Sequence, residues 1–522
     1  MRLAELVAVS AAVAATRSRK EKTALIADLL GRTEPDERAL VAHYLSGRLR
    51  QRRTGLGWRG LQQLPPAAEQ PGALTVGEVD AAFESISRLS GPGSAGARSA
   101  AVAELFGRAT AEEQAWLRAI AVGEVRQGAL DAIVIEAVAA AAAVPLGEVR
   151  RAAMLAGGAT YAVDAAFSGV EALHAIGLTV GRPVLPMLAS SAPDLASALE
   201  KLGGRQVAVD AKLDGIRIQV HRSGADVVVA TRSLEQITHR LPEVVEAVLA
   251  LPATDLVLDG EAIALDEDGR PRPFQETASR TASRPDPEGG RAGTKQGVAV
   301  TPYFFDVLHL DGRDLIDLPA SERWTALDAL VPERHRVPRW VGQADDVEAA
   351  QAFTDLVLAG GHEGVVVKDV AAPWEAGRRG AAWVKVKPVH TLDLVVLAVE
   401  WGSGRRRGWL SNIHLGARDE TSPTGFVMLG KTFKGMTDAM LAWQTERFTE
   451  LALDPAAVAD QHVVQVRPEQ VVEIAFDGLQ RSSRYPGGLA LRFARVVRYR
   501  DDKSADEADD LATVRDVGNI RQ

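Results

Sequence analysis

A segment with three prolines separates two kinds of sequence in this chain. Pro183, Pro186 and Pro193 lie within residues 182–195, and proline lacks the backbone N–H that a helix needs and restricts the residue before it. Apolar residues recur at helical spacing before this segment, whereas short runs rich in β-branched residues follow it. We therefore expect a domain linker here, with residues 182–187 extended.

Residues 1–190 are predicted to form an all-α domain. Residues 22–30 and 129–138 carry apolar side chains three and four positions apart, which indicates amphipathic helices. Residues 91–94 predict a loop. The first fifteen residues superficially resemble a signal peptide, but Glu5 interrupts their apolar run, so we expect a first helix.

The rest of the chain predicts two further domains, because 522 residues correspond to about three domains of ordinary size. Residues 191–388 alternate strand-like and helical stretches and predict a mixed α/β domain, with a Gly- and Pro-rich loop at 284–297. Residues 389–522 contain several short strand-like runs and one helical run at 437–451. This pattern suits a β-barrel of the five-stranded OB-fold type.

Composition limits the possible cofactors and partners. The chain has no cysteine, which excludes disulfides, iron–sulfur clusters and cysteine-rich zinc modules. Its net charge is −9, yet arginines gather at 48–59 and at 405–407, and binding of a polyanion depends on local charge. Each cluster is equally compatible with a solvated surface. No stretch is long and apolar enough to span a bilayer, so we expect a cytoplasmic protein.

The sequence Lys212-Leu213-Asp214-Gly215-Ile216-Arg217 is the strongest pointer to chemistry. A lysine amine that is partly deprotonated can attack phosphorus and hold a nucleotide as a phosphoramidate. One such pattern is weak, because turns with a flanking lysine are common. Here it opens an ordered series of charged or aromatic segments, at residues 231–233, 258–262, 303–308, 363–368, 383–387, 491–495 and 500–503.

This ordered series resembles the motif set of the covalent nucleotidyltransferases, and most closely the ATP-dependent DNA ligases of the bacterial and archaeal type. The resemblance runs through nearly the whole chain. It implies that Lys212 becomes adenylated, that AMP passes to the 5′-phosphate at a nick, and that the 3′-hydroxyl displaces AMP. The bacterial ligases that use NAD carry a four-cysteine zinc finger, which this cysteine-free chain cannot form.

The resemblance also implies cofactors, partners and a cellular setting. ATP would donate AMP, Mg²⁺ would be the metal, and nicked double-stranded DNA would be the substrate. We expect a monomer that works at the nucleoid in DNA replication, repair or recombination. In this reading residues 1–190 bind DNA, residues 191–388 form the adenylation domain, and the domain of residues 389–522 closes over it.

The chemistry sets requirements on Lys212 and on two acids. Lys212 must attack as a free amine, so we expect Lys385, Lys387, a metal and partial desolvation to lower its pKa. Glu261 and Glu363 end or follow strand-like runs, and their hard oxygens suit Mg²⁺. Taken singly, either acid would be an ordinary surface residue.

The resemblance assigns the nucleotide to side chains from most of these segments, namely Asp210, Arg217, Arg232, Glu261, Phe305, Arg379, Lys385 and Lys387. Asp210 would contact the adenine edge and Phe305 would stack on the base, although Phe305 alone would suit a β-core equally well. Arg217 and Arg232 would contact sugar or phosphate, and Glu261 would also contact the ribose. Asp210 departs from the family, which usually has the longer glutamate there.

A late segment is assigned to pyrophosphate. Arg500, Asp502 and Lys503 would orient the leaving group, and since they lie far from Lys212 in sequence, their domain must close for adenylation and reopen for DNA. Ala494 stands where the family usually has proline, a change expected to affect local stiffness rather than chemistry.

Two glycine turns in the helical domain are candidates for DNA contact. They are Gly47-Arg48-Leu49-Arg50 and the turn from Gly123 to Gly128 that contains Arg126. Glycine permits close backbone approach, and arginine supplies bidentate donors. On physical grounds alone each turn is an ordinary helix connection. The second also resembles an element of the ligase DNA-binding domain, so Arg48, Arg50 and Arg126 are the predicted contacts.

Two other functions share some of these features. An RNA ligase or a capping-type nucleotidyltransferase would share the motifs, but those enzymes generally lack a helical domain of this size. A catalytically inactive DNA-binding scaffold would keep the fold without the chemistry. Every motif here retains its reactive residue, which argues against the scaffold.

Overall fold

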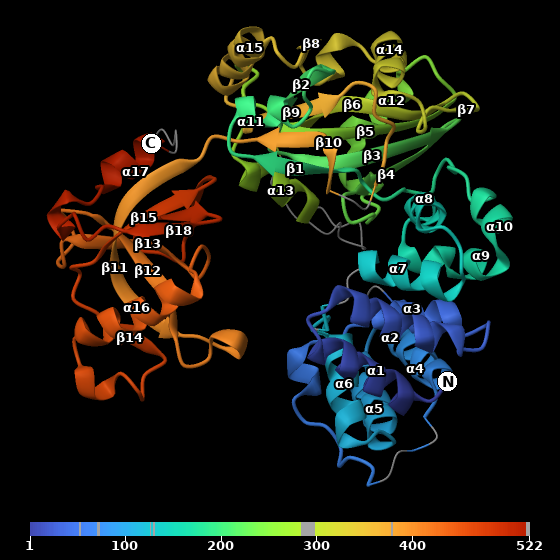
Figure 1. The fold of residues 1–522 in the computed structure, drawn as a ribbon, viewed down its shortest axis with the longest axis horizontal. Helices are drawn as coiled ribbons and strands as arrows, with labels where there is room; N and C mark the ends of the chain where they lie inside the picture. Colours follow the sequence, from blue (N-terminus) through green and yellow to red (C-terminus); the bar gives the residue numbers. More distant parts are fainter. Residues whose placement is uncertain are drawn as a thin grey trace.

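The computed structural model describes residues 1–51, 54–69, 72, 74–125, 127–128, 131–282, 298–376 and 379–517, without the side chains of 281–282, 379–381 and 457. Three regions follow one another along the chain: helices in blue to cyan, two sheets in green, yellow and light orange, and a third sheet in orange to red (Figure 1). Within the described residues, no helix is long and apolar enough to cross a membrane.

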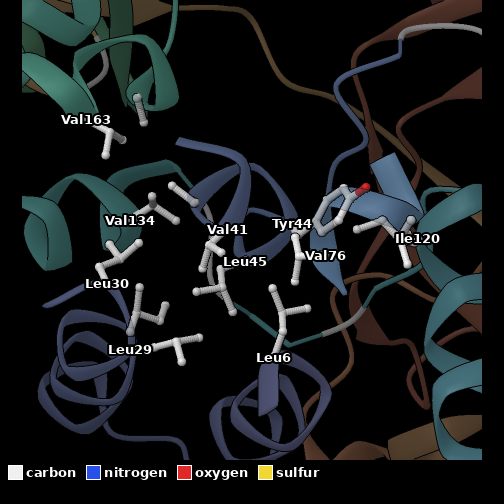
Figure 2. Packing of buried hydrophobic residues seen from close by; sticks show 14 of the residues in the cluster. Leu6, Leu29, Leu30, Val41, Tyr44, Leu45, Val76, Ile120, Val134 and Val163 are labelled. Atoms are coloured by element: carbon white, nitrogen blue, oxygen red, sulfur yellow. The ribbon is translucent and has the colours of Figure 1, made fainter. Parts of the chain in front are cut away.

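The described elements before residue 182 are helical, as the spacing of apolar residues predicts. They are α1 (Leu3–Ala15), α2 (Arg19–Gly31), α3 (Arg38–Leu45), η1 (Trp58–Leu61), α4 (Val76–Arg88), α5 (Ser94–Gly107), α6 (Ala111–Ala121), α7 (Asp131–Ala141), α8 (Leu146–Ala156), η2 (Ala159–Ala162), α9 (Val163–Ser168) and α10 (Val170–His174). Capping boxes begin α4 at Thr75 and α6 at Thr110, and each satisfies backbone donors that a helix start leaves free. Leu6, Leu29 and Leu45 meet in the shared core (Figure 2).

The segment after the helices lies along a strand of the central region without forming a regular strand itself. The Val184 backbone N–H donates to Gln219 Oε1 at 2.8 Å, and Gln219 Nε2 donates back to the Val184 carbonyl at 3.3 Å. A backbone bond from Leu185 to Met154 ties the same segment to α8. The linker is therefore bound on both sides.

The central region contains two five-stranded sheets, in the orders β1-β10-β9-β2-β8 and β4-β3-β5-β6-β7. Its strands are β1 (Leu188–Ala192), β2 (Gln206–Lys212), β3 (Ile216–Ser223), β4 (Asp226–Thr231), β5 (Asp255–Ala264), β6 (Val300–Leu310), β7 (Arg313–Asp314), β8 (Arg339–Gln343), β9 (Gly364–Asp369) and β10 (Arg379–Val386). Its helices are α11 (Leu195–Glu200), α12 (Pro242–Leu249), α13 (Phe274–Ala282), α14 (Ala320–Leu330) and α15 (Val347–Ala359). Side chains of α11 and α15 pack on one face of the first sheet, and those of α12 and α14 pack on the second sheet. The predicted loop 284–297 lies entirely outside the described residues.

The C-terminal region has one larger sheet and a two-stranded ribbon, β16-β17. Its elements are β11 (His390–Trp401), β12 (Leu410–Arg418), β13 (Phe426–Thr432), α16 (Asp438–Glu450), β14 (Val463–Gln465), β15 (Val471–Phe476), β16 (Gly478–Arg481), β17 (Leu489–Arg492), β18 (Arg495–Tyr499) and α17 (Leu511–Val517). The helix predicted at 437–451 is confirmed by α16.

The strands of this region do not pair into the closed barrel that the sequence predicts. The order is β13-β12-β11-β15-β18, with β14 also on β11, and among the described strands no ladder joins β13 to β18. The two ends approach through the turn after β13, where the Val496 N–H donates to the Lys434 carbonyl at 2.9 Å. A backbone hydrogen bond from this turn therefore connects the two ends of the sheet in place of the β-ladder that a closed barrel requires.

Candidate active site

Lys212 ends β2 next to the start of β9, where it pairs with Gly364. The Glu363 N–H donates to the Lys212 carbonyl at 3.0 Å, which sets the glutamate beside the lysine. A Cβ at Gly364 would lie 2.2 Å from the Val386 carbonyl oxygen, and its φ is +151°, so the strand start needs glycine. The Glu363 carboxylate accepts hydrogen bonds from both Lys212 and Lys387.

The alternation of strand side chains gathers the charged residues of the first sheet on one face. Val207, Val209 and Ala211 of β2 point into the helix-covered core, so Asp210 and Lys212 point to the opposite face. The same parity gives that face a series of residues from the paired strands: Val366, Lys368, Trp383 and Lys385, followed by Lys387. Charged residues from separate motifs of the sequence therefore lie together on one face of the first sheet.

The second sheet contributes Arg217 and Glu261, which are direct partners in the β3–β5 ladder. The Arg217 guanidinium donates to both Asp259 oxygens at 3.0 and 2.7 Å. Between the two sheets, the chain turns at Gly215, where a Cβ would lie 2.3 Å from Ile263 Cγ2. The glycine therefore lets the Lys212 turn pack directly on β5.

The pKa of Lys212 is lowered, as the chemistry requires, and burial is the main cause. The expectation from the sequence placed neighbouring cations before desolvation as the cause of the lowered pKa. Arg492 adds to the lowering, while Glu261 and Asp214 oppose it. Burial also raises the pKa of Glu261 to about 7. The pKa of Lys387 is lowered by burial and then by the charge of Lys212.

Phe305 lies among cationic and aromatic side chains from both sheets. Its ring is 5.8 Å from that of Trp383 in an edge arrangement, and Lys368 Nζ is 4.5 Å from its centroid. Asp210 accepts from Arg339 and pairs with Lys368 at 2.6 Å. Sequence reasoning assigned no role to Arg339 or Lys368. Lys368 shares the parity of the site face, which is a usable signal, whereas Arg339 belongs to none of the recognised segments.

Three other residues were predicted to contact the nucleotide: Arg232, Arg379 and Lys385. Arg232 is exposed in the turn after β4. Arg379 begins β10, but its side chain lies outside the described residues. Lys385 is partly buried on the site face of β10.

The C-terminal region touches the site through residues that the sequence did not assign. Arg492 Nη1 donates to Asp214 Oδ2 at 2.6 Å, and Asp477 lies 3.6 Å from Lys387 Nζ. Asp477 also pairs with Arg495 at 3.3 Å. Arg492 falls in a recognised motif, so its chain position was a signal, whereas Asp477 had none.

The residues predicted to orient pyrophosphate contact one another and Asp393, rather than Lys212, in this arrangement. Arg500 Nη1 and Lys503 Nζ donate to Asp393 at 2.8 and 2.7 Å, and Arg500 also donates to Asp502 at 2.7 Å. All four side chains belong to the C-terminal region.

The two glycine turns of the helical region lie side by side. A Cβ on Gly47 would be 3.6 Å from Val125, and Gln127 Nε2 donates to the Leu45 carbonyl. Two of the three predicted DNA contacts already have acidic partners. Arg48 pairs with Asp131 at 3.2 Å, and the Arg50 guanidinium donates to Asp80 and Glu84, at 2.8 Å to Asp80. Arg126 lies outside the described residues.

Comparison with known proteins places the whole chain in one family. Family models match three segments: "DNA ligase N terminus" at residues 61–139, "ATP dependent DNA ligase domain" at 186–387 and "ATP dependent DNA ligase C terminal region" at 406–503. The chain is 68% identical over 518 residues to a probable DNA ligase of Nocardioides sp., covering 98% of both. It is 61% identical over 528 residues to a probable DNA ligase of Beutenbergia cavernae, covering 100% of both.

A solved structure named Pmar-Lig_PreS3 resembles the fold with a TM-score of 0.62, at 18% identity, over 95% of this chain and 99% of that chain. The ordered motifs around Lys212, the match of all three family models and the full-length identity agree. The chain belongs to the ATP-dependent DNA ligases.

Proposed function

We propose that this ligase seals nicks in duplex DNA through an AMP bound covalently to Lys212. The observation that carries the proposal is the position of Lys212 at the end of β2, partly buried between Glu261 and Glu363, with a lowered pKa. A lysine whose pKa is lowered offers more of the free amine, which is the nucleophilic form. Its neighbours supply the charges that phosphoryl transfer needs.

In the first step the Lys212 nitrogen attacks the α-phosphorus of ATP. A nitrogen–phosphorus bond forms, the bond to pyrophosphate breaks, and the nitrogen gives up a proton. Glu363 accepts a hydrogen bond from Lys212 and is placed to take that proton. Lys385, Lys387 and Arg379 would hold the phosphates, and Arg217 and Arg232 the sugar or a phosphate.

The base would lie against Phe305, with its edge toward Asp210. Phe305 is flanked by Trp383 and by the Lys368 ammonium. An adenine amino group is a donor, and a carboxylate is an acceptor. This pairing favours adenine over guanine, whose edge presents a carbonyl at the same position.

The two glutamates fit a magnesium ion bound together with the nucleotide. Within the described chain, no group of three or more His, Cys, Asp or Glu side chains is arranged as a metal cage. Mg²⁺ usually keeps waters and substrate phosphates and takes only one or two carboxylates, and Glu261 and Glu363 both lie beside Lys212. The raised pKa of Glu261 reflects the cost of burying its negative charge, and a bound cation would offset that cost. When bound, the ion would neutralise charge on the phosphates.

The regions would rearrange between steps. The present arrangement brings Arg492 to Asp214, while Arg500 and Lys503 contact Asp393 instead. Arg500, Asp502 and Lys503 would reach pyrophosphate only after the C-terminal region turns. AMP then passes to the 5′-phosphate of the nick, and the 3′-hydroxyl displaces it.

We assign domain boundaries and partners on the same basis. Residues 1–190 would be an all-α DNA-binding domain, residues 191–388 the adenylation domain, and residues 389–522 a domain of the OB-fold type whose barrel is not closed by a ladder, all three around nicked duplex DNA. The adjoining glycine turns with Arg48, Arg50 and Arg126 would contact phosphates. We expect a monomer acting at the nucleoid in replication, repair or recombination.

The test is to mix the protein with α-labelled ATP, GTP or NAD and follow label on the protein. ATP should give a stable adduct that disappears when pyrophosphate is added in excess, and this adduct should seal nicked DNA when no free ATP is present. An adduct from NAD but not from ATP, or sealing without any adduct, would overturn the proposal. Nicked duplex RNA in place of DNA separates a DNA ligase from an RNA ligase.

A further inference from the structure

The Asp210 carboxylate is held by two cations. Arg339 Nε donates to Oδ1 at 2.5 Å and Arg339 Nη2 donates to Oδ2 at 2.8 Å, while Lys368 Nζ lies 2.6 Å from Oδ2. The Asp210 side chain is only 2% exposed. A buried carboxylate is costly unless it is paired, and here the pairing also fixes the plane of the carboxylate.

Strand register explains why Arg339 can do this. Asp210 of β2 and Arg339 of β8 are direct partners in an antiparallel ladder, so their side chains leave the sheet on the same face a few ångströms apart. Aspartate is one methylene shorter than the glutamate expected from the resemblance. A neighbouring arginine on the next strand holds this shorter acid in a defined orientation.

Arg339 is itself restrained from two further sides. Its Nη2 also donates to the Phe305 carbonyl at 2.9 Å, and its guanidinium carbon lies 3.8 Å from the centroid of the Trp324 ring. Trp324 is buried on α14. The Arg339 guanidinium therefore links Asp210, which is proposed to contact the edge of the base, to the backbone of Phe305, which is proposed to stack on the base.

The number of acceptor positions leaves room for one more donor. An ionised carboxylate offers about four lone-pair positions. Among the residues that the structure describes, Arg339 uses one on Oδ1 and one on Oδ2, and Lys368 uses the other on Oδ2. One position on Oδ1 remains. The amino group of adenine would fill it, whereas the carbonyl of guanine would face an acceptor.

We infer that Arg339 is a positioning residue for base selection, which orients Asp210 and Phe305 relative to each other so that the site takes adenine and rejects guanine. The inference rests on the proposed function, because it assumes that AMP is bound at this site. Lysine could not replace Arg339, since it lacks the planar fork that binds both oxygens and the flat face that stacks on Trp324.

The test is the Arg339→Lys variant of the full chain, assayed for self-adenylation with ATP and with GTP. The KM for ATP should rise about tenfold with kcat little changed, and the preference for ATP over GTP should fall about tenfold, because the edge contact is lost and the chemistry is not. Sealing of pre-adenylated nicked DNA, measured at saturating DNA, should fall much less than the efficiency of adenylation, because its AMP is already attached to the DNA. A general structural defect would lower every step together.

Arg336→Lys is the matched control. Arg336 pairs with Asp328 at 2.5 Å, three residues before Arg339 and outside the Asp210 contacts, so its KM and base preference should match the wild type. Wild-type KM and base preference in a folded Arg339→Lys variant would overturn the inference. Should that variant fail to fold, Asp210→Asn with Arg339→Met removes both charges together.

This double variant should accept GTP about as well as ATP, because an amide presents a donor as well as an acceptor. Retention of the wild-type preference for ATP would overturn the inference. Failure of the wild type to form any adduct with ATP would instead contradict the proposed function, so the two failures are distinguishable.

Discussion

Two clusters in this ligase each place two basic side chains on one carboxylate, yet the pKa values of those basic groups shift in opposite directions. Lys212 and Lys387 share the carboxylate of Glu363, and Arg500 and Lys503 share that of Asp393. Burial lowers the pKa of both lysines in the first cluster. In the second, the hydrogen bond to Asp393 raises the pKa of Lys503, and that to Asp502 raises the pKa of Arg500.

The difference shows that burial, more than the choice of partner, separates a nucleophile from a permanent cation. Desolvation destabilises a charged amine, whereas a hydrogen bond to an acid stabilises it. The cluster on the β2–β9–β10 face is therefore suited to lose a proton. The cluster on the C-terminal region is suited to stay charged and to move toward an anion.

Among the variants that test this contrast, Lys212→Ala should lose the most activity. Self-adenylation with ATP should fall by at least about a thousandfold, because the nucleophile is absent. Sealing of DNA that already carries AMP at the nick should continue at a measurable rate. The control is Lys201→Ala, whose ammonium donates to the Ser191 carbonyl at 2.8 Å, and it should keep both activities. Undiminished labelling of the Lys212→Ala protein would remove Lys212 from the mechanism.

Substitutions in the C-terminal region should separate the steps. Lys503→Ala should slow adenylation about a hundredfold and leave sealing of pre-adenylated nicks nearly intact, because pyrophosphate is present only in the first step. Arg492→Ala should do the reverse, since Arg492 contacts Asp214 in the arrangement that holds Arg500 and Lys503 away from Lys212. Single-turnover rates of the two steps measure this. Equal losses in both steps for both variants would mean that neither residue is step-specific.

Glu261→Gln should change the pH dependence of stability. The folded pKa of Glu261 is about 7, against the ordinary value of 4.5 for a glutamate, so folding favours the protonated acid. Its contribution is fully present below pH 4.5 and is lost as the pH rises to about 7. The variant should therefore gain stability over the wild type by at most about 3 kcal/mol between acidic and alkaline pH.

Urea denaturation at both pH values measures this difference, with Glu267→Gln as the control because Glu267 is exposed. A constant difference between Glu261→Gln and the wild type across the pH range would mean that burial does not perturb Glu261. Such a result would also weaken the contrast between the two clusters, which depends on burial at the Lys212 site.

The smallest effects are expected in the helical region. Binding to nicked DNA should weaken as salt rises, and Arg48→Ala should reduce the slope of log K against log salt by about 0.9, the value for one phosphate contact. Arg50→Ala should change the slope less, because Asp80 and Glu84 both contact Arg50. Titrations at several salt concentrations check both values. An equal or larger change for Arg50→Ala would show that DNA displaces these acids. The contribution of Arg126 stays a prediction.

Side chains that alternate along a strand keep their spacing in the fold, so residues from separate motifs gather on one sheet face. Lys212, Glu363 and Lys387 lie in contact there, and their roles toward the nucleotide and the metal stay predictions. Arg339 was missed, since its role depends on the register between β2 and β8, which no local pattern records. The acidic partners of Arg48 and Arg50 were missed for a similar reason: their contacts join residues 30 or more positions apart.

The helical, mixed and strand-rich regions followed from periodicity and from the prolines near residue 183. Closure of the last sheet did not. Strand-like runs predict the presence of strands, whereas a barrel requires a ladder between the first and last of them. Here the two ends of the sheet are connected by a backbone hydrogen bond at the Lys434 turn, and not by a ladder.

The most direct test of the central claim is to locate the AMP. After incubation with ATP, the protein would be digested and the modified peptide sequenced by mass spectrometry. The account predicts AMP on Lys212 alone. Lys387 is the informative rival, because it shares Glu363 with Lys212 and its pKa is also lowered. AMP on Lys387, or on no lysine of this site, would contradict the account.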